Sequence, residues 1–224
     1  TSSDGTSWTS RNSGTSSRLR GITYGNSTYV TVGDGGTILT SSDRALWTSR
    51  TSGITNDLLG VNFLNSTFVA VGYGGSILTS SDGISWTSRT SGTTNSLNRV
   101  TYGNSTFVAA GGTVSGGKIL TSSDSISWTS RTNAAPSLLY AVTYGNSTFV
   151  ATGDGGTILT SSDGTSWISR NSGTSSQLWG ITYGNSTYVT VGDSGTILTS
   201  SDGTSWSSRT SGVSVQLFGV TYKE

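Results

Sequence analysis

The amino-acid sequence predicts an all-β fold, a β-propeller of four-stranded antiparallel blades with about 39 residues per blade. Three observations lead to this prediction. Strand-forming residues alternate with short turn sequences, and only one proline interrupts them. No stretch has the 3.6-residue apolar periodicity of a helix. A tryptophan recurs at nearly constant intervals, at Trp8, Trp47, Trp86, Trp128, Trp167 and Trp206.

The tryptophans are 39, 39, 42, 39 and 39 residues apart, which is the spacing of a repeat protein. The longer interval has three extra residues in the third repeat, where GGTVSGGK at 111–118 replaces GDGGT. Insertion into a glycine-rich turn costs little free energy. A parallel β-solenoid is the alternative architecture, but solenoid coils are usually shorter and lack two-residue hairpins. The period therefore favours radial blades.

Each repeat divides into four short strands. In the first full repeat, Gly25 and Asn26 are expected to form a two-residue hairpin, because both tolerate positive φ. Alternation in the next strand places Val30 and Val32 on the face opposite Tyr29 and Thr31. The four expected strands of this repeat cover residues 19–25, 27–33, 37–42 and 46–50, followed by a polar link at 51–57.

The length favours six blades with an incomplete closing blade. Six repeats of 39 residues with the three-residue insertion need 237 residues, 13 more than the 224 present. The absent stretch corresponds to the 13-residue string STYVTVGDGGTIL. A five-bladed ring with leftover end strands is the alternative. Within one propeller domain, 1–224, we expect full blades at 19–57, 58–96, 97–138, 139–177 and 178–216, a last strand of the closing blade in 1–18 and its first strand in 217–224.

The turn Ser2-Ser3-Asp4-Gly5-Thr6-Ser7-Trp8 resembles the Asp-box of sialidase-like propellers, S-x-D-x-G-x-x-W. The order of strands and turns is also similar to that of photosystem II assembly factor-like propellers. The resemblance covers the whole chain, although Asp and Trp are four residues apart here and five in the usual box. It implies a structural turn, in which the aspartate accepts backbone N–H bonds and the tryptophan lies between blades. The turn recurs at 41–47, 80–86, 122–128, 161–167 and 200–206.

An arginine follows each of these tryptophans by three residues. We expect each arginine to pack on a neighbouring aromatic ring or to pair with a carboxylate of the turn. The alternative, a ring of anion sites, is disfavoured because the outer strand lies far from a central channel. The arginines are Arg11, Arg50, Arg89, Arg131, Arg170 and Arg209.

The composition argues against several kinds of chemistry. The chain has no cysteine and no histidine, so we expect no disulfide, no metal and no cofactor. Charged residues make up 10% and the net charge is +1, which predicts no nucleic-acid surface. No apolar run is long enough to span a membrane. The sialidase-like enzymes that the turn resembles use an arginine triad and a tyrosine–glutamate pair, and the only glutamate here is Glu224. We therefore expect no enzyme.

The candidate ligand site lies where the repeats differ. The leucine that opens each inner strand is followed by six different residues, at a position that a propeller places on the rim of its channel. The turn between second and third strands reaches the same face. Drift at a tolerant position is the alternative, but large aromatic side chains at a channel mouth suit ligand binding. The candidates are Arg20, Leu59, Asn98, Arg99, Tyr140, Trp179, Phe218, Asp34, Tyr73, Asp154 and Asp193.

These features predict a non-catalytic binding module that recognises a glycan or a protein at the channel rim. A structural element that self-associates through its incomplete blade is the first alternative, and a sialidase-like hydrolase is the second. Neither the ligand nor the compartment can be assigned from the sequence, with secretion or display on a bacterial surface the favoured location. Any ligand is expected over the arc that joins Tyr140, Trp179 and Phe218 to Arg20.

Overall fold

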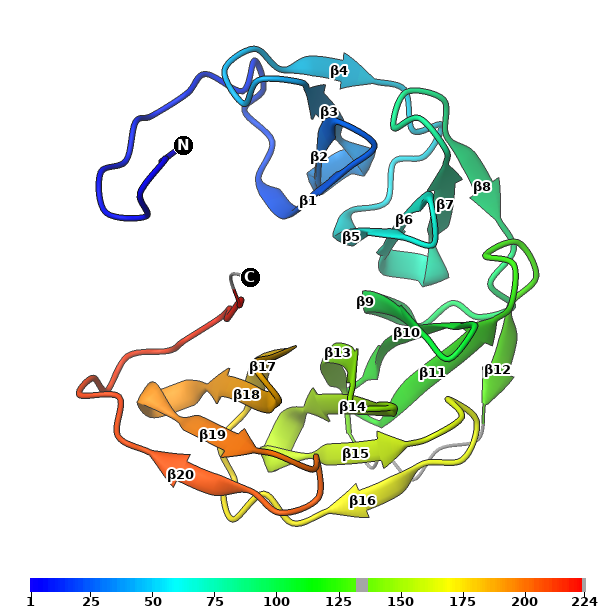
Figure 1. Ribbon diagram of the computed structural model, residues 1–224. Helices are drawn as coiled ribbons and strands as arrows, with labels where there is room; N and C mark the ends of the chain where they lie inside the picture. The colour runs from blue at the N-terminus through cyan, green and yellow to red at the C-terminus, as the bar shows by residue number, and fades with distance from the viewer. Residues whose placement is uncertain (132–136, 223–224) are drawn as a thin grey trace.

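The chain forms a ring of five four-stranded antiparallel sheets, so the predicted all-β propeller is confirmed (Figure 1). The computed structural model describes residues 1–131 and 137–222, and Pro136 and Glu224 lie outside the described residues. In each sheet the strands follow one another in chain order, and the first strand lies next to the centre of the ring. The first strands pack side by side in the order β1, β5, β9, β13 and β17.

The strands are short, and the fourth strand of every blade has three residues. The first blade has β1 (Leu19–Gly25), β2 (Thr28–Gly33), β3 (Ile38–Ser41) and β4 (Thr48–Arg50). The second has β5 (Leu58–Leu64), β6 (Thr67–Gly72), β7 (Ile77–Ser80) and β8 (Thr87–Arg89), and the third has β9 (Ser96–Gly103), β10 (Thr106–Thr113), β11 (Gly116–Ser122) and β12 (Thr129–Arg131). The fourth has β13 (Leu139–Gly145), β14 (Thr148–Gly153), β15 (Ile158–Ser161) and β16 (Ile168–Arg170), and the fifth has β17 (Leu178–Gly184), β18 (Thr187–Gly192), β19 (Ile197–Ser200) and β20 (Ser207–Arg209).

A short 3₁₀ turn joins the second and third strands in four blades, and its glycines adopt positive φ. The turns are η1 (Asp34–Gly36), η2 (Tyr73–Gly75), η3 (Asp154–Gly156) and η4 (Asp193–Gly195). In the third blade the three inserted residues instead lengthen the hairpin, because β10 and β11 stay paired as far as Thr113 and Gly116.

The hairpin between first and second strands differs from the prediction. Its two turn residues are Asn26 and Ser27, with φ of 46° and 57°, rather than Gly25 and Asn26. Gly25 is the last residue of β1, and a Cβ there would lie 2.0 Å from Cγ of Phe63 in the next blade. Glycine is therefore required at this position by packing between blades, while asparagine and serine form the turn.

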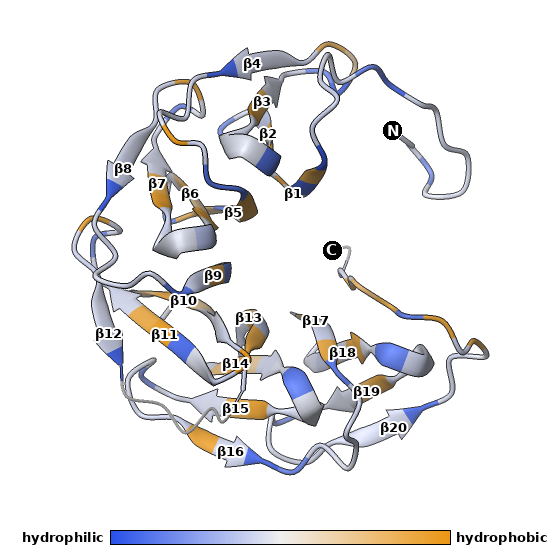
Figure 2. Ribbon diagram, turned by 180° about the vertical axis from the view of Figure 1, so that it is seen from behind, coloured by the Kyte–Doolittle hydropathy of each residue, from blue (hydrophilic) through white to orange (hydrophobic). Residues whose placement is uncertain are grey.

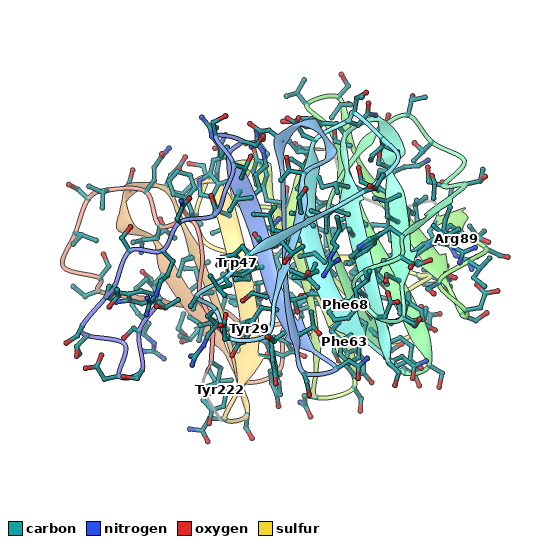
Figure 3. All side chains as sticks on the ribbon, turned by 90° about the horizontal axis from the view of Figure 1, so that it is seen from above. Tyr29, Trp47, Phe63, Phe68, Arg89 and Tyr222 are labelled. Atoms are coloured by element: carbon teal, nitrogen blue, oxygen red, sulfur yellow. The ribbon has the colours of Figure 1, made fainter. Side chains whose placement is uncertain are left out.

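The core consists of apolar clusters between neighbouring blades. Val30, Val32 and Ile38 of the first blade pack with Leu58 and Phe68 of the second. The pattern repeats at the other interfaces, and the predicted inward alternation of Val30 and Val32 is confirmed by their complete burial. Figure 2 shows hydrophobic residues on β7, β11 and β19 but none along the outer strands β8, β12 and β20. Figure 3 labels Phe63 and Phe68, whose ring centroids are 4.6 Å apart.

The serine–aspartate turns form the hydrogen bonds expected from the sequence. Asp82 Oδ1 accepts the backbone N–H groups of Ile84 and Ser85 at 2.8 and 2.9 Å. Ser80 Oγ donates to the same oxygen at 2.9 Å. The Trp86 indole donates to the carbonyl of Gly83 at 2.9 Å and packs against the cluster between the first two blades. The turn thus fixes the tryptophan at the interface between blades.

Stability should decrease in acid because of these turns. Backbone donors lower the pKa of Asp82, chiefly the N–H of Ser85, and the pKa is also lowered for Asp4, Asp43, Asp124, Asp163 and Asp202. A carboxylate whose pKa is lower in the folded state stabilises it above the unfolded pKa of about 3.9, and the stabilisation is lost as the pH falls further. Urea midpoints should be constant above about pH 5 and fall below about pH 4.

The matched variant for this measurement is Asp82→Asn, which keeps an acceptor oxygen but cannot titrate. Its urea midpoint should fall less between pH 5 and pH 2.5 than that of the unchanged chain. Equal acid dependence in the two proteins would contradict the role assigned to the turn.

Each repeated arginine binds a threonine, which differs from the predicted aromatic or carboxylate partner. Arg50 Nε donates to Thr40 Oγ1 of the adjacent strand at 2.8 Å, and Arg89 donates to Thr79 in the same way. Within the described residues, the ion pairs involve only Arg20, so no repeated arginine pairs with a turn carboxylate. The arginines therefore join the third strand to the fourth.

The ring is open between the blade β17–β20 and the blade β1–β4. We call this interval the open sector; residues 1–18 and 210–222 border it (Figure 1). Within the described residues there are five complete blades, and neither 1–18 nor 217–222 forms a strand. Both segments lack the neighbouring strands with which a closing blade would pair them. The predicted blade boundaries are not otherwise tested.

Candidate functional site

One cavity brings together most of the predicted ligand residues. It has a volume of about 670 Å³ and lies where the first strands begin. Eight of the eleven predicted residues line it: Arg20, Leu59, Tyr73, Asn98, Arg99, Tyr140, Trp179 and Phe218. The lining also includes Arg18, Leu19, Ser96, Gly112 and Leu138. We call this cavity the cup. Below it, a second cavity of about 560 Å³ follows the channel and shares Arg20, Arg99, Trp179 and Phe218 with the cup.

Three aromatic rings lie in sequence along one side of the cup. The ring centroids of Tyr140 and Trp179 are 4.1 Å apart, and those of Trp179 and Phe218 are 5.7 Å apart. Trp179 is half-buried and its indole N–H donates to Asp193 Oδ1 at 2.6 Å. Phe218 is 63% exposed. This aromatic arc, Tyr140–Trp179–Phe218, offers a tilted apolar surface with one ring fixed at its polar edge.

Arg20 at the end of the arc is already neutralised. Its Nε donates to Asp34 Oδ1, and its Nη2 lies 3.5 Å from Asp57 Oδ2. The hydrogen bond to Asp34 is the main cause that raises the pKa of Arg20. Asp57 in turn accepts the backbone N–H of Gly35 at 2.9 Å. Arg20 therefore orders one wall of the cup and offers little free positive charge to a ligand.

Arg99 is the cation without a counter-ion. Its Nη1 donates to the carbonyls of Leu59 and Asn98 at 2.6 and 2.8 Å, and none of the described carboxylates pairs with it. Burial lowers its pKa, which reflects the cost of holding a charge in this position. The corresponding residues in the other repeats are small: Gly21, Gly60, Ala141, Gly180 and Gly219. A guanidinium with unused donors thus lies at the junction of cup and channel.

The three remaining predicted residues support the cup from behind. Asp34 binds Arg20, Asp193 binds Trp179, and Asp154 accepts a hydrogen bond from Gln177 Nε2 at 2.9 Å. None of them lines the cavity. Burial, followed by the charges of Asp154 and Asp193, raises the pKa of Tyr140, so its hydroxyl stays protonated at neutral pH. The turn aspartates therefore orient the lining side chains.

The sequence reasoning overlooked a second variable position, immediately before the leucine of each inner strand. Arg18, Ser96 and Leu138 line the cup from this position, and Asp57 and Gln177 bind lining or supporting residues. The signal was present in the repeats, because the position is occupied in order by Arg18, Asp57, Ser96, Leu138, Gln177 and Gln216.

The cup can bind but has no acid–base group. Its lining carries no aspartate, glutamate, histidine or cysteine. Over residues 1–131 and 137–222, no three such side chains gather where they could hold a metal ion. The same residues include no helix long and apolar enough to cross a membrane. What the cup offers a ligand is aromatic surface, the amide of Asn98 and the guanidinium of Arg99.

No family model and no curated protein matches the chain, whereas solved structures do. YCF48 bound to D1 peptide is 20% identical with a TM-score of 0.65, over 86% of this chain and 68% of that one. YCF48 from Cyanidioschyzon merolae is 15% identical with a TM-score of 0.64, over 86% and 72%. Streptogramin B lyase is 13% identical with a TM-score of 0.76, over 86% and 68%. At these identities the likeness shows the propeller fold alone, and membership of the Asp-box group stays a prediction.

Proposed function

We propose that the protein is a non-catalytic binding module and that the cup recognises a protein segment with an apolar side chain and a carboxylate. The observation that carries the proposal is the pairing of an aromatic arc with a cation that lacks a counter-ion. An apolar group fits over Trp179, and a carboxylate supplies the acceptors that Arg99 lacks. A propeller neighbour, YCF48, is recorded bound to a peptide, which is consistent with this use of the fold.

An acidic glycan is the second candidate ligand. Sugars stack on aromatic rings, and a uronic or sialic acid would bring the same carboxylate to Arg99. The protein segment is favoured because the three rings are tilted by 35° and 51° to one another, which suits a rounded aliphatic or aromatic side chain better than a flat sugar face. The proposal excludes hydrolysis, because the cup lining offers no carboxylate to act as acid or nucleophile.

The test uses two arrays, one of acidic glycans and one of random peptides in free-acid and amidated forms. The strongest binder is then titrated by calorimetry against the unchanged chain and against Trp179→Ala. We expect a peptide binder, and we expect Trp179→Ala to weaken it by about 2 kcal/mol, as loss of an aromatic anchor does. Because Trp179 is half-buried, the same change should cost only about 1 kcal/mol of stability.

Two variants serve as controls. Arg99→Gln should remove the preference for free-acid over amidated peptide while leaving the aromatic contribution. Ile168→Thr changes an exposed residue of β16 to the one that most repeats carry there, and it should leave binding unchanged. A binder whose affinity is insensitive to Trp179 and Arg99 would contradict the assignment of the cup.

A further inference from the structure

The wall of the open sector formed by the first blade exposes residues that are buried elsewhere. Leu19 is 37% exposed, whereas the leucine at the same repeat position is fully buried in the other four blades, at Leu58, Leu97, Leu139 and Leu178. In a closed interface this leucine packs on two valines and an isoleucine of the preceding blade, as Leu58 does on Val30, Val32 and Ile38. Leu19 has no such blade before it.

The opposite wall shows the same loss of cover. Val189 and Ile197 of the fifth blade are half-buried, whereas their counterparts Val108 and Ile119 have no exposed surface. In the closed interface between the third and fourth blades, these two side chains pack against the ring of Phe149. The open sector therefore lacks an aromatic ring on one side and a group of aliphatic side chains on the other.

The chain ends already occupy positions of a sixth blade. The Tyr222 ring lies where a Cβ at Gly184 would be 2.1 Å from it, as the Tyr183 ring does at Gly145 one blade earlier. At the outer edge, the Thr9 N–H donates to the Thr1 carbonyl at 2.7 Å, matching the pairing of Thr48 with Thr40. Arg11 Nε donates to Thr1 Oγ1 at 3.1 Å, matching Arg50 and Thr40. These contacts put 217–222 in the place of a first strand and 1–11 in that of a fourth.

We propose that the open sector binds a β-hairpin presented by another protein, with the pattern of the second and third strands of this repeat. The hairpin would pair with 217–222 through one strand and with residues near Thr1 through the other. Its required length is that of residues 27–39, STYVTVGDGGTIL, which separate the corresponding positions in the first blade. This site is separate from the cup and does not depend on the cup's ligand.

The pattern of the partner follows from the two walls. An aromatic third residue would pack on Val189 and Ile197, as Phe149 packs on Val108 and Ile119. Valines at positions four and six and an isoleucine at position twelve would cover Leu19, as Val30, Val32 and Ile38 cover Leu58. Glycine at position ten would allow the positive φ that Gly36 adopts.

A second copy of the chain is a poor donor of this hairpin. Each of its five hairpins is already paired inside a blade. Withdrawing one would open a gap in the donor with the same apolar walls as the gap it fills, so the exchange would bury no additional surface. A hairpin that is free in its own protein has no such loss, which is why the proposal names a different protein as the donor.

The experiment adds the synthetic peptide STYVTVGDGGTIL to the full chain. We expect binding at one site per chain by calorimetry and a higher thermal midpoint. The indole of Trp8, now 73% exposed, should become less accessible to acrylamide, because the peptide tyrosine would pack on it as Phe68 packs on Trp86. The control peptide has aspartate in place of both valines and should not bind. Trp8→Phe should keep the binding and lose the change in quenching.

Three variants locate the site. Val189→Ser should weaken peptide binding about tenfold, since it removes apolar contact with the peptide tyrosine. Ile168→Thr, exposed on the far side of the ring, should bind as the unchanged chain does. Arg44→Gly should bind more tightly. The residue at this position in the second blade is Gly83, where a Cβ would lie 3.0 Å from Val30 of the preceding blade.

Several results would overturn the proposal. These are no binding of the designed peptide, equal binding of the aspartate control, and equal weakening by Val189→Ser and Ile168→Thr. Concentration-dependent dimerisation of the chain alone, abolished by Val189→Ser, would also overturn it, because the occupant would then be a second copy. Peptide binding that is lost in Trp179→Ala would place the peptide in the cup instead of the open sector.

Discussion

Replacing Phe149 with alanine should lower the free energy of unfolding by about 3–5 kcal/mol. Phe149 has no exposed surface and lies in the cluster that joins the third and fourth blades. Its ring also contacts those of Tyr144 and Trp167, with centroids 4.6 and 6.4 Å away. Removing it leaves a cavity at an interface that both blades need. The measurement is equilibrium unfolding in urea, followed by circular dichroism.

The repeats supply a matched control for this change. Tyr29 occupies the same position in the first blade but borders the open sector, where it is half-buried (Figure 3). Tyr29→Ala should therefore cost about 1–2 kcal/mol, less than half as much. Equal losses for the two variants would mean that the first blade is covered in solution, contrary to the open ring.

Replacing Gly103 with alanine should cost about 3 kcal/mol, near the upper end of what overpacking usually costs. A Cβ at this position would lie 2.1 Å from Cγ and 2.2 Å from Cδ1 of Tyr144 in the next blade. These atoms are close to the base of the ring, so the tyrosine cannot move away without leaving its cluster. The two inner strands would have to separate.

Gly219→Ala is the control for Gly103→Ala. No atom lies within 4 Å of the position that a Cβ would take at Gly219. Its thermal midpoint should match that of the unchanged chain, while Gly103→Ala should lower the midpoint by several degrees. A stable Gly103→Ala variant would show that the inner strands are packed less closely than the structure indicates.

The architecture could be predicted because its signals are local and repeated. The tryptophan period, the alternation around Val30 and Val32 and the glycines of the turns each act within one blade, and the structure confirms them. The hairpin turn was misplaced because Gly25 is required by Phe63, which lies 38 residues later in the chain. A single repeat gives no sign of that contact, so the glycine was read as a turn residue.

The candidate site was predicted in membership but not in chemistry. Variation at one repeat position identified Trp179 and Arg99, which the structure places around the same cavity. Their different electrostatic states could not be foreseen, because Asp57, which helps neutralise Arg20, lies in a link between blades. Arg99 stands out only once the carboxylates around Arg20 are seen to be out of its ion-pair network. Charge pairing across blades depends on side-chain geometry that the repeat pattern does not contain.

The open sector has a mechanical consequence for the cup. Five blades in an open ring are joined by four interfaces, so small rotations at each interface add up at the opening instead of cancelling around a closed circle. Phe218, which forms one end of the aromatic arc, belongs to the segment at that free end. The diameter of the cup and the width of the opening are therefore one coupled coordinate, as in a split washer. Any molecule that holds the opening at one width must change the affinity of the cup by the same factor as the cup's ligand changes the affinity of the opening.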